Sequence, residues 1–329
     1  MRVPQEIAGP ARVRGGADGA ARPVPCRAPK TEVSRMLFHL SVLPRVAAGL
    51  ALCMLAITPA RADDAADRLA LTVRQIEDRL DARVGVVVRD SATGWSWGHR
   101  ADERFLMNST FKAPLCGALL ARVDAGETTL DTALPVTAAD MVDHAPVTET
   151  RIGATMTLDA LCRAAVDMSD NPAANIVLDH VGGPEGFTSF LRGIGDGTTR
   201  LDRTEPGLNT YAAGDPRDTT TPAAMVATLE RLLLGDALSA AARARLTGWM
   251  TPGSVTGALL RAHTPEGWHV ADKSGAGRVT RNIVGMVTPP GAAPHLVAIY
   301  LSEAEVDFAT RNAALSELSA AVVAVIAAR

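Results

Sequence analysis

The stretch Met107-Asn-Ser-Thr-Phe-Lys-Ala-Pro-Leu-Cys-Gly117 stands where the apolar residues of the chain change their spacing. Before it, Arg83-Val-Gly-Val-Val-Val-Arg89 and Trp95-Ser-Trp-Gly-His99 are typical of β-strands. After it, residues 108–250 follow a helical period that loops interrupt. Strand patterns return near the end of the chain, at 268–273, 283–287 and 296–301, before a helix from about 310. We therefore expect one sheet assembled from both ends of the chain, with an all-helical insertion.

The domain organisation follows from this alternation. We expect an α/β domain made of residues 63–107 and 251–329, and an all-helical domain made of residues 108–250. With 329 residues, 47% of them hydrophobic, the chain can bury a substantial core. The formal net charge of −3 argues against a nucleic-acid partner. Nothing in the sequence indicates oligomerisation, so we expect a monomer.

The first 62 residues differ from the rest in charge, with nine basic residues against three acidic ones, whereas the remainder has 24 basic and 33 acidic residues. Within residues 36–62, a short basic region precedes about a dozen apolar residues and ends in Ala60-Arg-Ala62, the pattern of a secretory signal peptide. The apolar run is too short to span a membrane, and we expect no later segment to be long and apolar enough. We therefore predict export to a bacterial periplasm, with no membrane anchor after removal of the leader.

Residues 1–35 are rich in Gly, Pro and Arg and show no periodicity. We expect them to be disordered, or never made if translation begins at Met36; a folded extension is the alternative. Four cysteines are present, but only Cys116 and Cys162 lie beyond the leader. In an oxidising compartment such a pair indicates a disulfide, and two separate buried thiols are the alternative.

Ser109 and Lys112 carry the first chemical signal. Lysine occurs only three times in the chain, against thirty arginines. If a helix opens at Ser109, the two side chains share one face, and the serine lies at the positive end of the helix dipole. A serine nucleophile needs an adjacent base. Lysine can be that base if it loses its proton, whereas arginine stays protonated. By itself the pair is also compatible with a capping serine and a solvated lysine.

Two further motifs favour the chemical interpretation. Ser169-Asp-Asn171 follows the helical run 158–168, and Lys273-Ser-Gly275 ends a predicted strand. Ser-x-x-Lys, Ser-Asp-Asn and Lys-Thr-Gly, in this order, are the signature of class A β-lactamases and penicillin-binding proteins. The third motif here has Ser for Thr, which keeps the hydroxyl. Over residues 63–329 the chain resembles the class A serine β-lactamases, which implies an α/β fold with an antiparallel sheet flanked by helices and an inserted all-helical domain.

The resemblance extends to a loop and implies a reaction in two steps. Arg203-Thr-Glu-Pro-Gly-Leu-Asn209 looks like the omega loop of the family, and Arg203 and Asp218 match the ion pair that ties its ends. The alternative for Glu205 is an exposed loop carboxylate. The catalytic residues implied are the nucleophile Ser109, the bases and relays Lys112, Ser169 and Glu205, the water-binding Asn209, and Ala276, whose N–H joins that of Ser109 in the oxyanion hole.

Other positions follow from the same resemblance. Cys116 and Cys162 match the disulfide of the family. The substrate-binding residues implied are Asn171, Lys273, Ser274, Gly275, Arg281 and, where members often carry an aromatic residue, His144. The charge of Lys273 is expected to help keep Lys112 neutral. The segment before Arg281 is one residue shorter than in common members. Cysteines at 108 and 277, which mark disulfide-type carbapenemases, are replaced by Asn and Gly.

The expected function is hydrolysis of the β-lactam amide of penicillin-like antibiotics through a serine acyl-enzyme, with the β-lactam as small-molecule partner. Seven histidines lack the spacing of metal ligands, so we expect no metal and no cofactor. Two alternatives stay open: a D-alanyl-D-alanine peptidase, for which Glu205 and its loop are not expected, and a non-catalytic penicillin or peptidoglycan sensor. Gly94-Trp-Ser-Trp-Gly98 matches a nucleophile elbow, but a charged segment follows, so Ser96 is expected in a strand.

Overall fold

The computed structural model describes residues 58–329. The predicted start segment 1–35, and the predicted leader up to residue 57, lie outside the described residues. The elements along the chain confirm the expected order of strands, helices and strands. The helices are α2 (Thr58–Leu80), α3 (Lys112–Asp124), α4 (Leu158–Asp167), α5 (Asn171–His180), α6 (Gly183–Gly193), α7 (Pro222–Leu233), α8 (Ala240–Met250), α9 (Leu260–His263) and α10 (Phe308–Ala327).

One antiparallel sheet of five strands forms the centre of the fold, in the order β2-β1-β9-β8-β7. Its first two strands come from the N-terminal side of the chain and the other three from the C-terminal side, as expected. Short paired strands and four 3₁₀ turns lie outside it. The strands are β1 (Arg83–Asp90), β2 (Ser96–His99), β3 (Phe105–Leu106), β4 (Ala133–Pro135), β5 (Thr155–Thr157), β6 (Thr219–Thr220), β7 (His269–Ala276), β8 (Arg281–Thr288) and β9 (His295–Ser302); the turns are η1 (Asn108–Phe111), η2 (Ala138–Asp140), η3 (Thr148–Arg151) and η4 (Gly207–Asn209).

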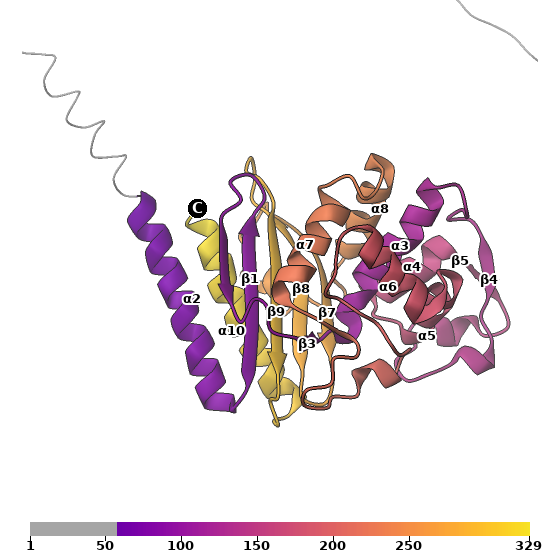
Figure 1. Ribbon diagram of the computed structural model, residues 1–329, viewed down its shortest axis with the longest axis horizontal. Helices are drawn as coiled ribbons and strands as arrows, with labels where there is room; N and C mark the ends of the chain where they lie inside the picture. Colours follow the sequence, from indigo (N-terminus) through magenta and orange to yellow (C-terminus); the bar gives the residue numbers. More distant parts are fainter. Residues whose placement is uncertain (1–57) are drawn as a thin grey trace, which may run out of the picture. The chain divides into compact units, whose positions relative to one another are not determined.

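Both faces of the sheet are buried, which explains the near-continuous apolar runs of its strands. Val84, Val86 and Val88 of β1 face α2 and α10, whereas Val87 faces the helices of the middle section. Figure 1 shows α2 and α10 on one side of the sheet and α7 on the other. Gly85 also faces the α7 side, where a Cβ would lie 2.4 Å from the ring of Phe105. A side chain at position 85 would therefore displace that ring.

One helix corrects an expectation about membranes. Within residues 58–329, α10 alone is long and apolar enough to cross a membrane by length and composition. It packs against α2, α9 and the sheet, and half of its most apolar window is buried. The expectation that no segment after the leader would qualify was therefore wrong. The apolar residues of α10 are those of a core helix, because they complete the hydrophobic cluster on this face of the sheet.

The middle section surrounds a buried helix, α3. Every residue from Lys112 to Leu120 is buried, with α4, α5, α6, α7 and α8 packed around the helix. Ser109 lies in the 3₁₀ turn η1, and the α-helix itself begins at Lys112. Pro114 consequently lies in the first turn, where its missing N–H costs no helical hydrogen bond. Because α3 is packed on all sides, its buried contacts fix the direction in which Lys112 projects, and they hold the preceding turn that carries Ser109.

The division into two domains stays a proposal. The two hydrophobic clusters support it in part, since one lies between the sheet and α2, α9 and α10. The other cluster includes the helices of the middle section together with the opposite face of the sheet, reaching Tyr300 and Val284. Any boundary between the two domains therefore passes through this second cluster. Ser96 lies in β2 as predicted, and a turn follows it.

A disulfide joins Cys116 of α3 to Cys162 of α4, as predicted. Both residues are buried, so the bond ties the helix that begins just after Ser109 to the helix that precedes Ser169. It links two parts of the site through the core of the helical section.

Replacing Cys116 and Cys162 together by Ala is expected to lower the free energy of unfolding. The cysteines lie 46 residues apart, and closing a loop of that length stabilises by about 4 kcal/mol in the chain-entropy estimate. Urea unfolding of the oxidised protein and the variant measures the difference, and the reduced parent is the control. Equal midpoints for the variant and the oxidised parent would contradict this estimate.

Candidate active site

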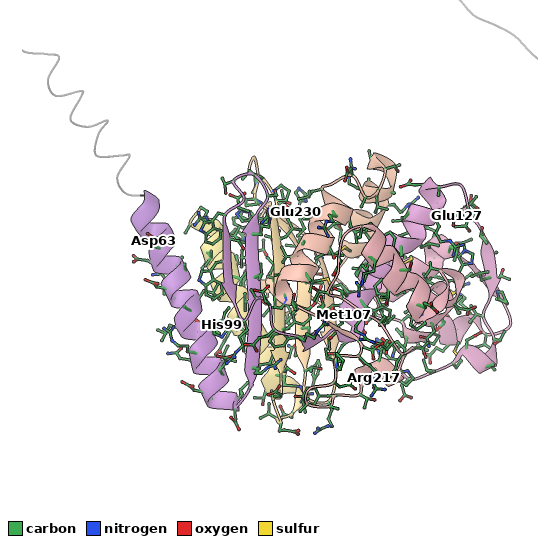
Figure 2. All side chains as sticks on the ribbon, in the orientation of Figure 1. Asp63, His99, Met107, Glu127, Arg217 and Glu230 are labelled. Atoms are coloured by element: carbon green, nitrogen blue, oxygen red, sulfur yellow. A yellow bond between two sulfur atoms is a disulfide. The ribbon has the colours of Figure 1, made fainter. Side chains whose placement is uncertain are left out.

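Ser109 and Lys112 meet the carboxylate of Glu205 where η1 passes into α3. The Oγ of Ser109 donates to Glu205 Oε1 across 3.4 Å, and Lys112 Nζ lies 3.2 Å from the same oxygen. The side chains of Lys112 and Glu205 are fully buried, whereas Ser109 is partly exposed. Met107, labelled in Figure 2, lies between the sheet and the middle helices. The nucleophile candidate is thus the accessible member of an otherwise buried polar group.

Lys112 is held by three acceptors. Its Nζ donates to the carbonyl of Ser169 at 2.8 Å and to Asn171 Oδ1 at 2.5 Å, in addition to its contact with Glu205. Burial lowers the pKa of Lys112, and the neighbouring Glu205 opposes this shift. Desolvation of the ammonium is thus the main cause of the lowered pKa, rather than the charge of Lys273 that the sequence suggested. The shift favours the neutral amine that a general base requires.

Lys273 approaches from the sheet. It lies in β7, is fully buried, and its Nζ donates to Ser169 Oγ at 3.1 Å and to the carbonyl of Ser274 at 2.7 Å. Burial lowers the pKa of Lys273 well below its ordinary value, and repulsion by Lys112 and Arg281 adds to this shift. The hydroxyl of Ser169 therefore has the amine of Lys273 on one side, and its own backbone carbonyl contacts Lys112.

The turn between α4 and α5 holds Ser169 and Asn171 in place. Ser169 has φ 60°, a left-handed conformation that costs free energy for a serine. Asp170 stabilises the turn, because its buried carboxylate accepts bonds from the N–H groups of Val147, Thr148 and Ala173. It also caps α5. This fixed turn directs Ser169 toward Lys273 and Asn171 toward Lys112.

Glu205 is positioned by neighbours on both of its sides. The amide of Asn175 on α5 accepts from the N–H of Glu205 at 2.9 Å and donates to its carbonyl at 2.9 Å. Asn209 Nδ2 donates to Glu205 Oε2 at 2.6 Å. The ends of the loop are joined by Arg203 and Asp218, whose Nε and Oδ2 lie 2.5 Å apart. The alternative of an exposed loop carboxylate is excluded, since Glu205 is 2% exposed.

The end of β7 lies against the nucleophile. A Cβ on Gly275 would lie 3.2 Å from the backbone nitrogen of Ser109 and 2.8 Å from the carbonyl of Met107. Only glycine allows this approach of the strand to η1. Ala276 follows at the exposed end of β7, and Ser274 is buried beside Lys273. The N–H groups of Ser109 and Ala276 are therefore carried on two backbone segments in close contact.

Arg281 and His144 flank this group. Arg281 pairs with Ala276 across the β7–β8 ladder and donates to the Gly275 carbonyl at 3.1 Å, while its Nε donates to Asn312 Oδ1 at 3.0 Å. Burial lowers the pKa of Arg281 to about 10, which leaves it charged at neutral pH. His144 is exposed, and its backbone carbonyl accepts from the N–H of Asn171 at 3.0 Å. Both residues lie next to residues of the predicted site.

Several residues in the site were not predicted from the sequence. These are Asn175 and Asn108, whose side chains contact residues of the predicted site, and Asp170, whose side chain stabilises the turn of Ser169 and Asn171. The sequence motifs assigned no chemical role to any of the three. The sequence holds a signal for Asn175 only, since it follows Asn171 by one helical turn and so shares its face. Within residues 58–329, no group of three His, Cys, Asp or Glu side chains could hold a metal ion.

Comparison with known proteins gives concordant similarities. A family model described as "Beta-lactamase enzyme family" matches residues 68–326. A beta-lactamase of Rhodobacter capsulatus is 55% identical over 291 residues, which cover 88% of this chain and 99% of that protein. Beta-lactamase AER-1 of Aeromonas hydrophila is 46% identical over 253 residues, which cover 76% of this chain and 83% of that protein.

Solved structures agree with these sequence matches. A beta lactamase from Xanthomonas campestris superposes with a TM-score of 0.77 at 47% identity, covering 80% of this chain and 98% of that one. The class A beta-lactamase of the last common ancestor of Gram-negative bacteria superposes with a TM-score of 0.76 at 50% identity, covering 80% and 99%.

Proposed function

Because this chain belongs to the class A serine β-lactamases, which hydrolyse β-lactams and confer resistance to them, we propose which of its residues carry each step. The observation that supports the assignment best is the meeting of Ser109, Lys112 and Glu205 at one carboxylate oxygen. Acyl transfer to serine and hydrolysis of the acyl-enzyme require a hydroxyl, an amine with a lowered pKa and a buried acid in one contact group.

In the acylation half, Ser109 Oγ attacks the lactam carbonyl, and its proton passes to Lys112 or Glu205. Glu205 Oε1 lies 3.4 Å from Ser109 Oγ and 3.2 Å from Lys112 Nζ, so Glu205 can take the proton itself or stand beside Lys112 when Lys112 takes it. The carbonyl oxygen receives hydrogen bonds from the N–H groups of Ser109 and Ala276 as it becomes an oxyanion. The C–N bond of the ring then breaks, and the proton that left Ser109 passes through Lys112 and Ser169 to the departing nitrogen; Ser169 Oγ also accepts from Lys273.

In the deacylation half, Glu205 removes a proton from a water molecule that attacks the ester. Asn209 contacts Glu205 and is placed to bind the same water. The tetrahedral intermediate collapses with release of Ser109 Oγ, which recovers the proton that Glu205 took from the water. The ion pair of Arg203 and Asp218 holds the loop that carries both residues, and this preorganisation lowers the cost of positioning the water.

The substrate carboxylate is assigned to Lys273, Ser274 and Arg281, and the acyl side chain to Asn171, with Gly275 and His144 at the borders of the site. Two buried cations beside one hydroxyl suit an anion, because charge-assisted hydrogen bonds are stronger than neutral ones. We assign export to the periplasm from the leader pattern in residues 36–62, and action as a monomer without a membrane anchor.

Lys273 predicts a pH dependence. The lysine binds the carboxylate only while protonated, and its lowered pKa means that the charge is lost at a lower pH than for an ordinary lysine. We expect kcat/KM for a penicillin to fall on the alkaline side. Lys273→Arg should move this fall to higher pH, because arginine stays charged. The control is a β-lactam whose carboxylate is esterified, which should not show the fall. Identical profiles for the parent and Lys273→Arg would contradict the assignment.

One experiment distinguishes the proposed mechanism from the alternatives. The mature protein is incubated with a chromogenic cephalosporin, and product and adduct mass are followed together. Many turnovers per molecule support hydrolysis through a short-lived acyl-enzyme. A single stoichiometric burst with a persistent adduct would indicate a sensor instead. Cleavage of a D-alanyl-D-alanine peptide without lactam turnover would indicate a peptidase.

A further inference from the structure

Asn108, immediately before the nucleophile, connects the sheet to the loop that carries Glu205. It is fully buried and has φ 47°, a left-handed conformation that asparagine tolerates better than most residues. Its Oδ1 accepts from Thr280 Oγ1 at 2.7 Å and from Asn282 Nδ2 at 3.0 Å. Its Nδ2 donates to Asn209 Oδ1 at 2.8 Å. Turn preference alone explains the backbone, but it does not explain this set of side-chain bonds.

The direction of each amide in this chain of bonds is fixed from both ends. At one end, Asn282 Nδ2 also donates to the carbonyls of Leu106 and Met107, which can only accept. This orientation leaves Asn282 Oδ1 buried without a partner. The opposite orientation would place Oδ1 against the two carbonyl oxygens and leave more buried groups unpaired, at a higher cost in free energy. At the other end, Glu205 Oε2 accepts from Asn209 Nδ2 and Oε1 accepts from Ser109 Oγ. Between these ends, only one arrangement of the Asn108 and Asn209 amides satisfies every bond.

That arrangement has a consequence for Asn209. Because Asn108 donates to Asn209 Oδ1, the Nδ2 of Asn209 must face Glu205, where it lies 2.6 Å from Oε2. The carbonyl oxygen of an amide has two acceptor positions. Asn108 occupies one of them, and the second stays open to a proton of the attacking water. The water is thus held between an acceptor of fixed direction and the carboxylate that removes its proton.

We propose that Asn108 is a positioning residue for deacylation, which turns the amide of Asn209 into the orientation that binds the hydrolytic water. The proposal rests on the proposed roles of Glu205 and Asn209. Asn108 touches neither substrate nor water, and it acts through Asn209. Its effect is therefore expected in the second half of the reaction, in which Asn209 binds the water, whereas attack by Ser109 requires no water molecule.

Two substitutions at position 108 separate the effect of the side-chain amide from the effect of the backbone conformation. Asn108→Gly keeps the left-handed conformation accessible and removes the amide, so Asn209 can turn. We expect deacylation to slow about tenfold, the loss of one buried hydrogen bond, with acylation changed by less than about threefold. Asn108→Asp keeps the shape but cannot donate. Asn209 must then turn its Nδ2 to residue 108 and its Oδ1 to Glu205, and we expect deacylation to slow about a hundredfold.

Acylation is measured by stopped flow with a cephalosporin, and deacylation by the decay of the acyl-enzyme mass after excess substrate is removed. The matched control is Thr228→Val, which removes a buried hydrogen bond of 2.7 Å to Asp196 with no link to Asn209. This control should lower the melting temperature and leave the ratio of the two rates unchanged. A purely structural role of Asn108 would give the same result as the control, and would overturn the proposal.

A double-mutant cycle keeps the proposal testable if Asn108→Asp fails to fold. Asn209→Gly and Asn108→Gly are combined, and the two effects on deacylation should not add, because each removes the same bond. Additive effects would overturn the proposal. If Asn209→Gly alone deacylates at the normal rate, Asn209 does not bind the hydrolytic water. Absence of turnover in the parent would remove the proposed mechanism itself, so the three failures are distinguishable.

Discussion

Glu205→Ala is expected to turn the enzyme into an acyl-enzyme trap. Without the carboxylate, the water lacks a general base, and positioned bases contribute about a hundredfold to ten-thousandfold to such steps. We expect steady-state turnover of a penicillin to fall by about a thousandfold, while Ser109 is still acylated. Intact mass spectrometry should show one substrate mass added to almost every molecule. The physical reason is that Glu205 contacts both Ser109 and Asn209, whereas the substitution leaves Lys112, three residues from Ser109, in place as the base for acylation.

Two controls accompany this substitution. Glu205→Gln keeps the volume and one acceptor for Asn209, so it should trap the adduct with less disturbance of the loop. Arg217→Ala, in the same loop, removes an exposed guanidinium that pairs with Asp215 and does not contact Ser109 or Lys112; its turnover should stay within about threefold of the parent, since exposed ion pairs contribute little. If Glu205→Ala stays unlabelled, or continues to turn over at the parental rate, Glu205 does not activate the water.

Lys112→Arg is expected to abolish acylation, although it keeps the positive charge. Guanidinium cannot release its proton in a protein, so neither a base nor a proton carrier remains at position 112. We expect kcat/KM to fall about a thousandfold, within the range of general base catalysis. The burst of adduct formation seen by stopped flow should disappear. The proposed role would account for a lysine at position 112 in a chain with thirty arginines and three lysines.

The comparison with Lys112→Met separates charge from proton transfer. Methionine removes the charge and leaves Glu205 buried without its cation, which costs about 3–5 kcal/mol of stability for a buried pair. Lys112→Arg retains the pair, at a cost in packing of about 1–3 kcal/mol. Loss of acylation in both variants assigns proton transfer to Lys112. If Lys112→Arg retains acylation, Lys112 has only an electrostatic role, and Glu205 is the acylation base.

The strands and the general order of elements could be predicted because their apolar patterns are long. The β9 segment and the valines of β1 are buried on both faces, and such runs are conspicuous in a sequence. The start of α3 could not be predicted to the residue. Ser109 lies in a 3₁₀ turn where the backbone of residues 107–109 comes close to Gly275 of β7, and this contact joins segments far apart in the sequence.

The chemistry at the centre of the site could be predicted for a different reason. Ser109, Ser169, Glu205 and Lys273 belong to short motifs that need particular residue types, so their identity is visible without knowledge of packing. Burial as the dominant cause of the lowered pKa of Lys112 was not predictable, because it depends on how helices enclose the amine. Asn108 and Asn175 were missed since an asparagine acquires its role only from the partners that the fold brings to it.

The central claim is that Ser109 and Glu205 act on one acyl group in one site. The most direct test compares the intact masses of Glu205→Ala and of the double variant Ser109→Ala, Glu205→Ala after incubation with a penicillin. We predict an added substrate mass in the single variant, located on the peptide that contains Ser109, and no added mass in the double variant. Equal labelling of both proteins, or of neither, would contradict it.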